Sequence, residues 1–441
     1  MLTRNGYKVK KDDTYEALKK KLTVKPAIPP VFVKPQYVKS YKIYHETAQF
    51  IYVPKHFGVQ TFGPAKESYK GVVHDDGRWT FCGTLRPIQH EIAQTYLEKG
   101  DGMVCLQTGG GKTVLGLFIA SQLKTKTLIV VHNTFLRDQW TERIAQFIPS
   151  VRVGVLQGTR TDTEFDIVIA MLQSISKKEY PPATFGGFGL TIVDECHHIA
   201  SEVFVQAFQK ITSPRMMGLS ATPERKDGLM YVIEWFLGPI VYKSPQSDSA
   251  DTKVRVEVFT HAPDDPSFSD IIYNAQGVMS SVEMVTKLVK YPSRTKLLAT
   301  ILEDIDLDVR QILVLSDRVQ HCADIYEALS PDVRAKACIL SQKTKLADRN
   351  EWCLQKRILI ATYSMCKEGF DVPTLNTLMM ATPRPDIDQV VGRILRVEKN
   401  ARTLHPLILD IVDVAFRKQF EKRTKLYRAR QYTIEDVVMP E

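Results

Sequence analysis

The chain has 441 residues, 44% of them hydrophobic and 25% charged, a composition that excludes a disordered or collagen-like protein. Single hydrophobic cores stop growing at about 250 to 300 residues, so the length predicts more than one domain. The formal net charge of +9 lowers the cost of approaching a polyanion such as nucleic acid, although charge alone is weak evidence for such a partner.

The cysteines and the apolar runs bear on where the protein works. Seven cysteines stand singly, without a CxxC pair, which is typical of reduced, intracellular proteins. The polar and basic start of the chain lacks the apolar core of a signal peptide, and no apolar run approaches the roughly 18 residues of a membrane helix. We therefore expect a soluble, intracellular protein that is not secreted and has no membrane partner.

The first 80 residues differ in composition from the rest. They are rich in lysine at first and then punctuated by proline, with short β-branched and aromatic runs at Tyr41 to Tyr44 and Phe50 to Val53. Such runs between turn-forming residues predict a small strand-rich accessory module over residues 1–80. An extended arm that packs on the rest of the chain fits the pattern equally well.

From about Gly83 onward, short apolar runs alternate with helical stretches, which is the pattern of a parallel, doubly wound sheet. The strands predicted first are Met103 to Leu106, Thr127 to Val131, Asp166 to Ala170, Leu190 to Val193 and Met216 to Leu219. The pattern then restarts at Ile312 to Leu315, Ala337 to Leu340, Ile358 to Ala361, Thr377 to Met380 and Leu407 to Ile411. The fold class is therefore α/β with two tandem parallel-sheet domains, over residues 81–242 and 291–441, and the polar residues 243–290 are expected to form a linker.

A glycine-rich segment lies between the first of these strands and an apolar helix. It reads Gln107-Thr108-Gly109-Gly110-Gly111-Lys112-Thr113. Glycines let backbone N–H groups close around phosphate oxygens, Lys112 can neutralise the β- and γ-phosphates, and the Thr113 hydroxyl can bind Mg²⁺. The pattern departs from GxxxxGK[ST] at its first position, where Leu106 stands. A glycine-rich turn before a helix is the alternative interpretation.

Two adjacent carboxylates follow a later strand. Leu190 to Val193 runs directly into Asp194-Glu195-Cys196-His197-His198. An aspartate at the end of a strand can hold Mg²⁺, and the neighbouring glutamate can orient or deprotonate an attacking water. The competing interpretation makes Cys196, His197 and His198 metal ligands, but three consecutive residues rarely converge on one ion. The sequence thus predicts ATP hydrolysis with Mg²⁺ held by Thr113, Asp194 and Glu195.

With these motifs in place, the chain resembles a superfamily 2 helicase of the DExH type from about Leu85 to the C-terminus. In the first half, the segments similar to the family's motifs are Leu85 to Gln89 (adenine recognition), Val130 to Asn133 with Gln139 and Trp140 (motif Ia), Met171 to Ile175 (motif Ib) and Gly218 to Pro223 (motif III). In the second half, they are Val314 to Arg318 (motif IV), Ala361 and Thr362 with Gly369 to Pro373 (motif V), and Gln389 to Arg396 (motif VI).

The resemblance implies two RecA-like domains and a role for each matching residue. The implied catalytic residues are Lys112, Asp194, Glu195, Gln389, Arg393 and Arg396. The residues implied to bind ATP are Gln89, Thr108, Gly109, Gly110, Gly111, Lys112 and Thr113. Those implied to couple the nucleotide to the strand are His197, Ser220, Thr222 and Asp371, and those implied to contact nucleic acid are Asn133, Gln173, Ser174 and Thr362.

Within the superfamily, Ser220 to Gly228 and the DECHH box look most similar to the branch of the XPB repair helicase, phage recombination helicases and the poxvirus transcript-release helicase. Tyr52 to Gly58 also resembles sequences in large DNA viruses. The resemblance implies a monomeric motor that uses ATP to move 3′ to 5′ on DNA rather than RNA, with the transcription or replication machinery as a further partner. Two alternatives stay open, a translocase on duplex DNA and an ATP-driven factor that remodels a transcription complex.

Overall fold

The computed structural model describes residues 1–27, 37–74, 76–107, 109–197, 202–221, 225, 227–244, 253–263, 265–275, 277–341, 344, 346–366, 372–395 and 402–438. The chain divides into two compact units, Met1–Ser244 and Pro245–Glu441, each described here by itself. Four predicted site residues, Thr108, Thr222, Asp371 and Arg396, lie outside the described residues. In the part of the chain just defined, no helix has the length and apolar character needed to cross a bilayer.

An eight-stranded sheet forms the centre of the first unit. Its order is β10-β9-β11-β8-β12-β13-β7-β14, and all neighbours are parallel except β9 and β10. The strands are β7 (Gly102–Cys105), β8 (Thr127–Val131), β9 (Val153–Gln157), β10 (Arg160–Thr161), β11 (Ile167–Met171), β12 (Leu190–Val193), β13 (Arg215–Ser220) and β14 (Ile240–Lys243). Strands such as β8 are buried along their whole length, as expected for a parallel sheet covered on both faces.

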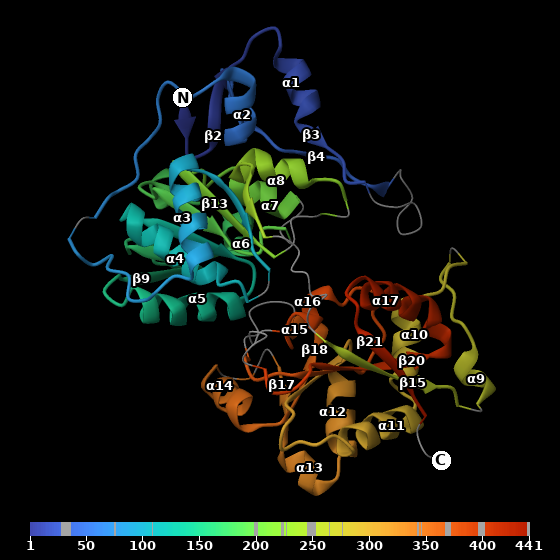
Figure 1. Cartoon of the computed structure of the whole chain (residues 1–441). Helices are drawn as coiled ribbons and strands as arrows, with labels where there is room; N and C mark the ends of the chain where they lie inside the picture. The colour runs from blue at the N-terminus through green and yellow to red at the C-terminus, as the bar shows by residue number, and fades with distance from the viewer. Residues whose placement is uncertain are drawn as a thin grey trace. The chain divides into compact units, whose positions relative to one another are not determined.

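Helices cover both faces of this sheet (Figure 1). One face packs on α3 (Pro87–Lys99), α4 (Lys112–Leu123) and α5 (Thr134–Phe147). The other packs on α6 (Leu172–Lys177), α7 (Glu202–Phe208) and α8 (Met230–Leu237). Successive strand residues alternate between the two cores, so that Leu128 and Val130 enter one while Ile129 and Val131 enter the other. The doubly wound α/β prediction is confirmed for this unit.

The N-terminal segment forms a small module with two short helices. An antiparallel sheet of order β1-β2-β6-β5 and a two-stranded ribbon β3-β4 accompany α1 (Tyr15–Lys21) and α2 (Lys55–Phe62). The strands are β1 (Leu2–Thr3), β2 (Gly6–Lys10), β3 (Thr23–Val24), β4 (Tyr41–Lys42), β5 (His45–Glu46) and β6 (Phe50–Val53). Its apolar residues continue into the core on the α8 side of the large sheet, where Phe57 meets Trp235 edge to face. Both sequence interpretations were therefore partly right, because the module is strand-rich and also packs on the rest of the unit.

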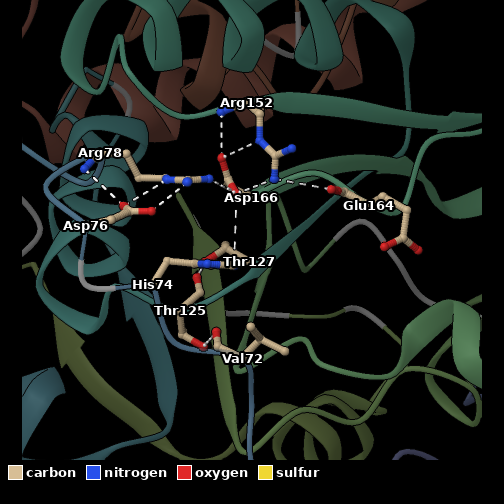
Figure 2. Close-up of polar contacts among 9 residues, drawn as sticks. All are labelled: Val72, His74, Asp76, Arg78, Thr125, Thr127, Arg152, Glu164 and Asp166. Atoms are coloured by element: carbon tan, nitrogen blue, oxygen red, sulfur yellow. Dashed lines mark hydrogen bonds and ion pairs between the residues drawn. The ribbon is translucent and has the colours of Figure 1, made fainter.

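An ion-pair cluster ties the last part of residues 1–80 to the N-terminal edge of the large sheet (Figure 2). Asp166, fully buried just before β11, pairs with Arg78 at 2.9 Å and with Arg152 at 3.0 Å. The backbone of Val72 and His74 adds hydrogen bonds to residues 124–126 and 187. Burial alone would raise the pKa of Asp166, but hydrogen bonds from Arg152 and the charges of Arg152 and Arg78 outweigh it and hold the pKa below its usual value.

The second unit contains a seven-stranded sheet of order β17-β18-β16-β19-β20-β15-β21, parallel throughout. Its strands are β15 (Arg255–His261), β16 (Ile312–Ser316), β17 (Ala337–Leu340), β18 (Ile358–Thr362), β19 (Thr377–Met380), β20 (Leu407–Asp413) and β21 (Thr433–Val437). Its helices are α9 (Pro266–Ser269), α10 (Ser281–Leu288), α11 (Pro292–Glu303), α12 (Val319–Ala328), α13 (Pro331–Ala335), α14 (Leu346–Gln355), α15 (Tyr363–Cys366), α16 (Asp388–Val391) and α17 (Arg417–Ala429). The α/β prediction is confirmed here as well.

The expected linker over residues 243–290 is where sequence and structure differ. This range contains β15, which pairs with β20 and β21 inside the second sheet, and the helices α9 and α10. Serine- and proline-rich flanks made the whole range look polar, but Arg255–His261 carries Val, Val, Phe and Thr, which favour a strand, and four consecutive residues of it are buried. The linker prediction was wrong for this segment, and the domain bounds otherwise stay a prediction.

Candidate active site

The glycine-rich loop lies at the C-terminal edge of the first sheet, between β7 and α4. Gly109 and Gly111 have φ angles of 82° and 76°, a left-handed conformation that glycine adopts without strain. A Cβ on Gly111 would come within 2.3 Å of the Gln89 side-chain nitrogen, so a larger residue would also displace Gln89. Because α4 begins at Lys112, its free N–H groups face this loop and favour an anion there.

The two carboxylates predicted to act on ATP lie directly beside this loop. Lys112 Nζ is 2.7 Å from Glu195 Oε1, and Asp194, which follows β12, is 4% exposed. Burial, followed by repulsion from Glu195, raises the pKa of Asp194 to about 6, although the charge of Lys112 opposes this. The structure thus brings Lys112, Asp194 and Glu195 together as the sequence predicts, with one lysine facing two acids.

Glu195 has an unusual backbone conformation. Its φ is 46°, in the left-handed region that a residue with a Cβ seldom adopts. Its N–H donates to Asp194 Oδ1 at 2.9 Å, which fixes the two carboxylates relative to each other. Non-glycine residues with such angles cluster at active sites, where the surrounding structure holds them in place.

His197 connects these acids to the next strand. Its Nδ1 is 2.7 Å from Ser220 Oγ at the end of β13 and 3.5 Å from Glu195 Oε2. Arg225 adds a bond from its guanidinium to the His197 carbonyl at 3.0 Å. His197 therefore contacts both Ser220 and Glu195. The family resemblance implies that His197 and Ser220 are coupling residues, and these contacts join them to the carboxylate pair.

The Gln89 side chain is hydrogen-bonded to the glycine-rich loop. Its amide nitrogen donates to the carbonyls of Gly110 and Gly111 at 3.2 and 3.3 Å, and its oxygen accepts from the Arg86 N–H at 2.9 Å. The side chain is 3% exposed. Reading an adenine would require Gln89 to exchange these bonds, so this role stays a prediction.

The residues predicted to contact nucleic acid in the first unit gather at the same edge of the sheet. Gln173 donates to the His132 carbonyl at 2.7 Å, Ser174 accepts from the Gly158 N–H, and the Asn133 side chain caps α5 by accepting from Leu136 at 2.8 Å. A cap is a structural role, so strand contact by Asn133 remains to be tested.

Trp140 belongs to the segment similar to motif Ia, which the resemblance places along a nucleic-acid strand, and for Trp140 that placement is wrong. Its side chain is fully buried, and its indole N–H donates to Asp194 Oδ2 at 2.8 Å. A buried indole needs a hydrogen-bond acceptor, and the Asp194 carboxylate supplies it. Trp140 is therefore a positioning residue for Asp194, which the motif pattern alone did not reveal.

In the second unit, the predicted residues lie near the C-terminal ends of its strands. Thr362 ends β18 and shares a hydrogen bond with Ser364 at 2.9 Å, Gln389 is half-buried in α16, and Arg393 is 4% exposed just beyond it. The sequence did not single out Arg384, whose Nε donates to Asp317 at 3.1 Å. This bond joins the residue that follows β16 to the segment that precedes α16.

The donors beside the loop suit a divalent cation. Burial and the neighbouring Glu195 raise the pKa of Asp194. Lys112, which opposes this shift, is expected to turn toward phosphate when ATP binds. Oxygen donors are the ligands that Mg²⁺ prefers, and the Thr113 hydroxyl stands in the first turn of α4. These residues fit a Mg²⁺–ATP complex.

Comparisons with known proteins agree with this geometry. Residues 83–225 match the family described as "Type III restriction enzyme, res subunit". The chain is 31% identical over its whole length, and over 87% of the relative, to L396 of Acanthamoeba polyphaga mimivirus, which is named as an ATP-dependent RNA helicase. It is 26% identical over 75% of its length, and 69% of the relative, to QP509L of African swine fever virus, named likewise. It is 36% identical over 38% of its length, and 37% of the relative, to XPB2 of Sulfurisphaera tokodaii, named as a DNA 3′-5′ translocase.

Proposed function

This chain belongs to the ATP-dependent helicases of superfamily 2, and we propose that it couples ATP hydrolysis to movement 3′ to 5′ along one strand of DNA. The observation that carries the proposal is the Lys112–Glu195 ion pair beside buried Asp194. It places a phosphate-neutralising cation, a metal-binding acid and a water-activating acid next to one glycine loop.

The choice of DNA and of direction is supported by one resemblance and opposed by another. Sequence motifs from Ser220 to Gly228 resemble the XPB branch, and the Sulfurisphaera relative bears the name of a DNA 3′-5′ translocase. The two viral relatives are named for RNA. If RNA and not DNA stimulates the ATPase in the test below, RNA replaces DNA as the proposed substrate.

In the proposed mechanism, Lys112 leaves Glu195 and faces the β- and γ-phosphates. Freed of that bond, the Glu195 carboxylate is available to orient and deprotonate the attacking water. One Mg²⁺ held by Thr113 and Asp194 would offset charge on the phosphates. The Trp140 N–H keeps one Asp194 oxygen fixed, so that the acid stays in position as the lysine moves.

Turnover is also proposed to require the second unit. Gln389, Arg393 and Arg396 form the QxxGRxxR pattern, and positively charged groups that reach a transferring phosphoryl stabilise its developing charge. Nucleic acid that engages both units would then favour hydrolysis. His197 and Ser220, bonded to each other beside Glu195, are the proposed route between the nucleotide and the strand.

An ATPase titration tests the proposal. Turnover is measured at one stated salt concentration with single-stranded DNA, blunt duplex DNA, forked DNA and RNA, because phosphate contacts weaken steeply with salt. We expect the largest stimulation from single-stranded or forked DNA, and displacement of a strand only from substrates with a 3′ single-stranded tail. Stimulation by RNA alone would overturn the DNA assignment, and turnover that no nucleic acid changes would overturn the translocase.

A further inference from the structure

The formal charge of the chain is concentrated in its N-terminal module. Residues 1–80 contain 15 Lys and Arg against 7 Asp and Glu, a formal net charge of +8, while the whole chain has +9. The rest of the chain, which carries every helicase motif, is thus close to neutral. A polyanion that approaches this protein is attracted first to the module.

The strand register shows which side chains share the free face of the module's sheet. Lys8 pairs with Tyr52, Lys10 with Phe50, and His45 with Tyr52. Because side chains alternate between faces, all five point away from the face that carries Tyr7, Ile51 and Val53. Those last three residues are buried in the core, whereas none of the five is buried.

Rings and cations lie together on this face. Lys8 Nζ lies 3.8 Å from the centre of the Phe50 ring. The His45 and Tyr52 rings are 5.8 Å apart and tilted by 55°. Lys8 therefore lies over the Phe50 ring, and Lys10 and the rings of His45 and Tyr52 share its face of the antiparallel sheet. This combination offers rings on which bases can stack and charge for the backbone that joins them.

We propose that the face formed by Lys8, Lys10, His45, Phe50 and Tyr52 is a second nucleic-acid site, which binds a single strand by stacking its bases on the rings. This inference rests on the proposed function, since it assumes that the motor acts on nucleic acid. The module is joined to the first sheet through a shared core and through Lys55, which is 2.8 Å from Asp101 before β7. A strand held on this face is thereby kept attached to the motor while ATP turns over.

A single strand fits this face better than a duplex does. In a duplex the bases are stacked on one another and paired, so their flat surfaces are not available to Phe50 and Tyr52. Splayed bases of a single strand can lie on the rings whatever their sequence, since every base has a flat surface. Lys8 and Lys10 provide phosphate contacts without reading sequence.

Two face variants and one control in the full-length chain test the inference. Lys8→Gln with Lys10→Gln removes two charges, and Tyr52→Leu removes a ring while keeping an apolar side chain. The control, Lys66→Gln with Lys70→Gln, removes two charges from exposed lysines of the same module outside these strands. Binding of a fluorescent oligothymidylate of about 20 nucleotides, and of a blunt duplex, is measured without ATP by anisotropy across a salt series.

Each face variant is expected to weaken oligothymidylate binding by about 10-fold at 0.1 M salt. In the lysine pair, the slope of log affinity against log salt is expected to fall by about 1.4. Melting temperature and basal ATPase should match the wild type, and the control should bind within about twofold of it. Face variants that bind like the control, or that weaken duplex binding by the same factor, would overturn the inference.

The two proposals can fail separately. Binding without ATP does not depend on turnover, so an ATPase that nucleic acid does not stimulate would overturn the motor function alone. Unchanged affinity in both face variants, beside normal stimulation of the wild type, would overturn the second site alone.

Discussion

Two buried aspartates at opposite edges of the first sheet have opposite electrostatics. Asp194 follows β12 at the C-terminal edge, where burial and then Glu195 raise its pKa to about 6. Asp166 precedes β11 at the N-terminal edge, where Arg152 and Arg78 overcome the effect of burial and lower its pKa. Both side chains are at most 4% exposed, but at Asp194 a second acid adds to the effect of burial, whereas at Asp166 two arginines oppose it.

The contrast distinguishes a candidate catalytic site, at Asp194, from an ion-pair cluster that stabilises the fold, at Asp166. At the N-terminal edge, Asp166 accepts bonds from two arginines and from the Arg152 backbone N–H, so its charge is matched within the fold. At the C-terminal edge, one lysine serves two acids, an arrangement that favours incoming phosphate and metal. Strongly perturbed carboxylates in such places are typical of active sites.

The largest expected effect comes from removing Lys112, the cation that pairs with Glu195 at the C-terminal edge. Lys112→Ala should reduce ATP turnover by more than about 10³-fold, because nothing else in the glycine loop neutralises the β- and γ-phosphates. Steady-state ATPase with saturating single-stranded DNA measures this. Turnover near the wild-type rate in a normally folded protein would remove the ATP-site assignment.

A similar loss is expected from the second unit. Arg396→Ala should still bind ATP through Gln89 and Lys112 but lose on the order of 10³-fold in turnover, as arginine fingers do elsewhere. Nucleotide affinity, melting temperature and ATPase are measured on the same preparation. If lost activity merely follows lost folded protein, Arg396 is a structural residue.

At the N-terminal edge the expected effect is on stability. Asp166→Asn removes a counter-charge from both arginines, but Arg78 keeps its pair with Asp76, and the side chains of Arg78 and Arg152 are 29% and 59% exposed and can turn to water. We therefore expect a loss of about 2 kcal/mol in the free energy of unfolding of the first unit and a melting temperature lower by about 5 °C. Calorimetry measures both, and an unchanged melting temperature would contradict the proposal that the Asp166 ion pairs stabilise the first unit.

The smallest effect is a pH dependence. Because the pKa of Asp166 is lower in the folded chain, its contribution to stability is present above the unfolded pKa of about 3.9 and is lost as pH falls through the folded value. The difference in free energy of unfolding between wild type and Asp166→Asn should thus be constant above about pH 5 and shrink below it. Urea unfolding between pH 7 and pH 3 measures it, and a difference that grows on acidification would reverse the assigned sign.

Most of the fold could be predicted from the sequence because buried parallel strands are continuous apolar runs. Thr127–Val131 and Leu190–Val193 were predicted to the residue. The missed strand β15 lies between polar segments and alternates Val with Arg and Glu. Its Val, Phe and Thr residues favour a strand, but its place in the sheet comes from pairing with β20 and β21, which joins residues more than 140 positions apart in the sequence.

The site was predictable where a motif is continuous in sequence and not where distant residues meet. The glycine loop and the DECH residues each form one run, so the roles of Lys112 and Glu195 could be predicted, although their contact joins residues 83 positions apart. The bond from Trp140 to Asp194 and the Arg78–Asp166 pair join residues 54 and 88 positions apart. Neither bond leaves a local signal in composition or spacing.

The most direct test of the account applies one chemical change at both edges. Glu195→Gln and Asp166→Asn each turn a carboxylate into an amide, and each variant is examined for ATP binding, turnover per folded molecule and melting temperature. We predict that Glu195→Gln binds ATP and melts like the wild type but loses turnover by at least about 10²-fold, while Asp166→Asn melts lower and keeps its turnover. Normal turnover in Glu195→Gln, or turnover lost from folded Asp166→Asn, would contradict the assignment of catalysis to the C-terminal edge.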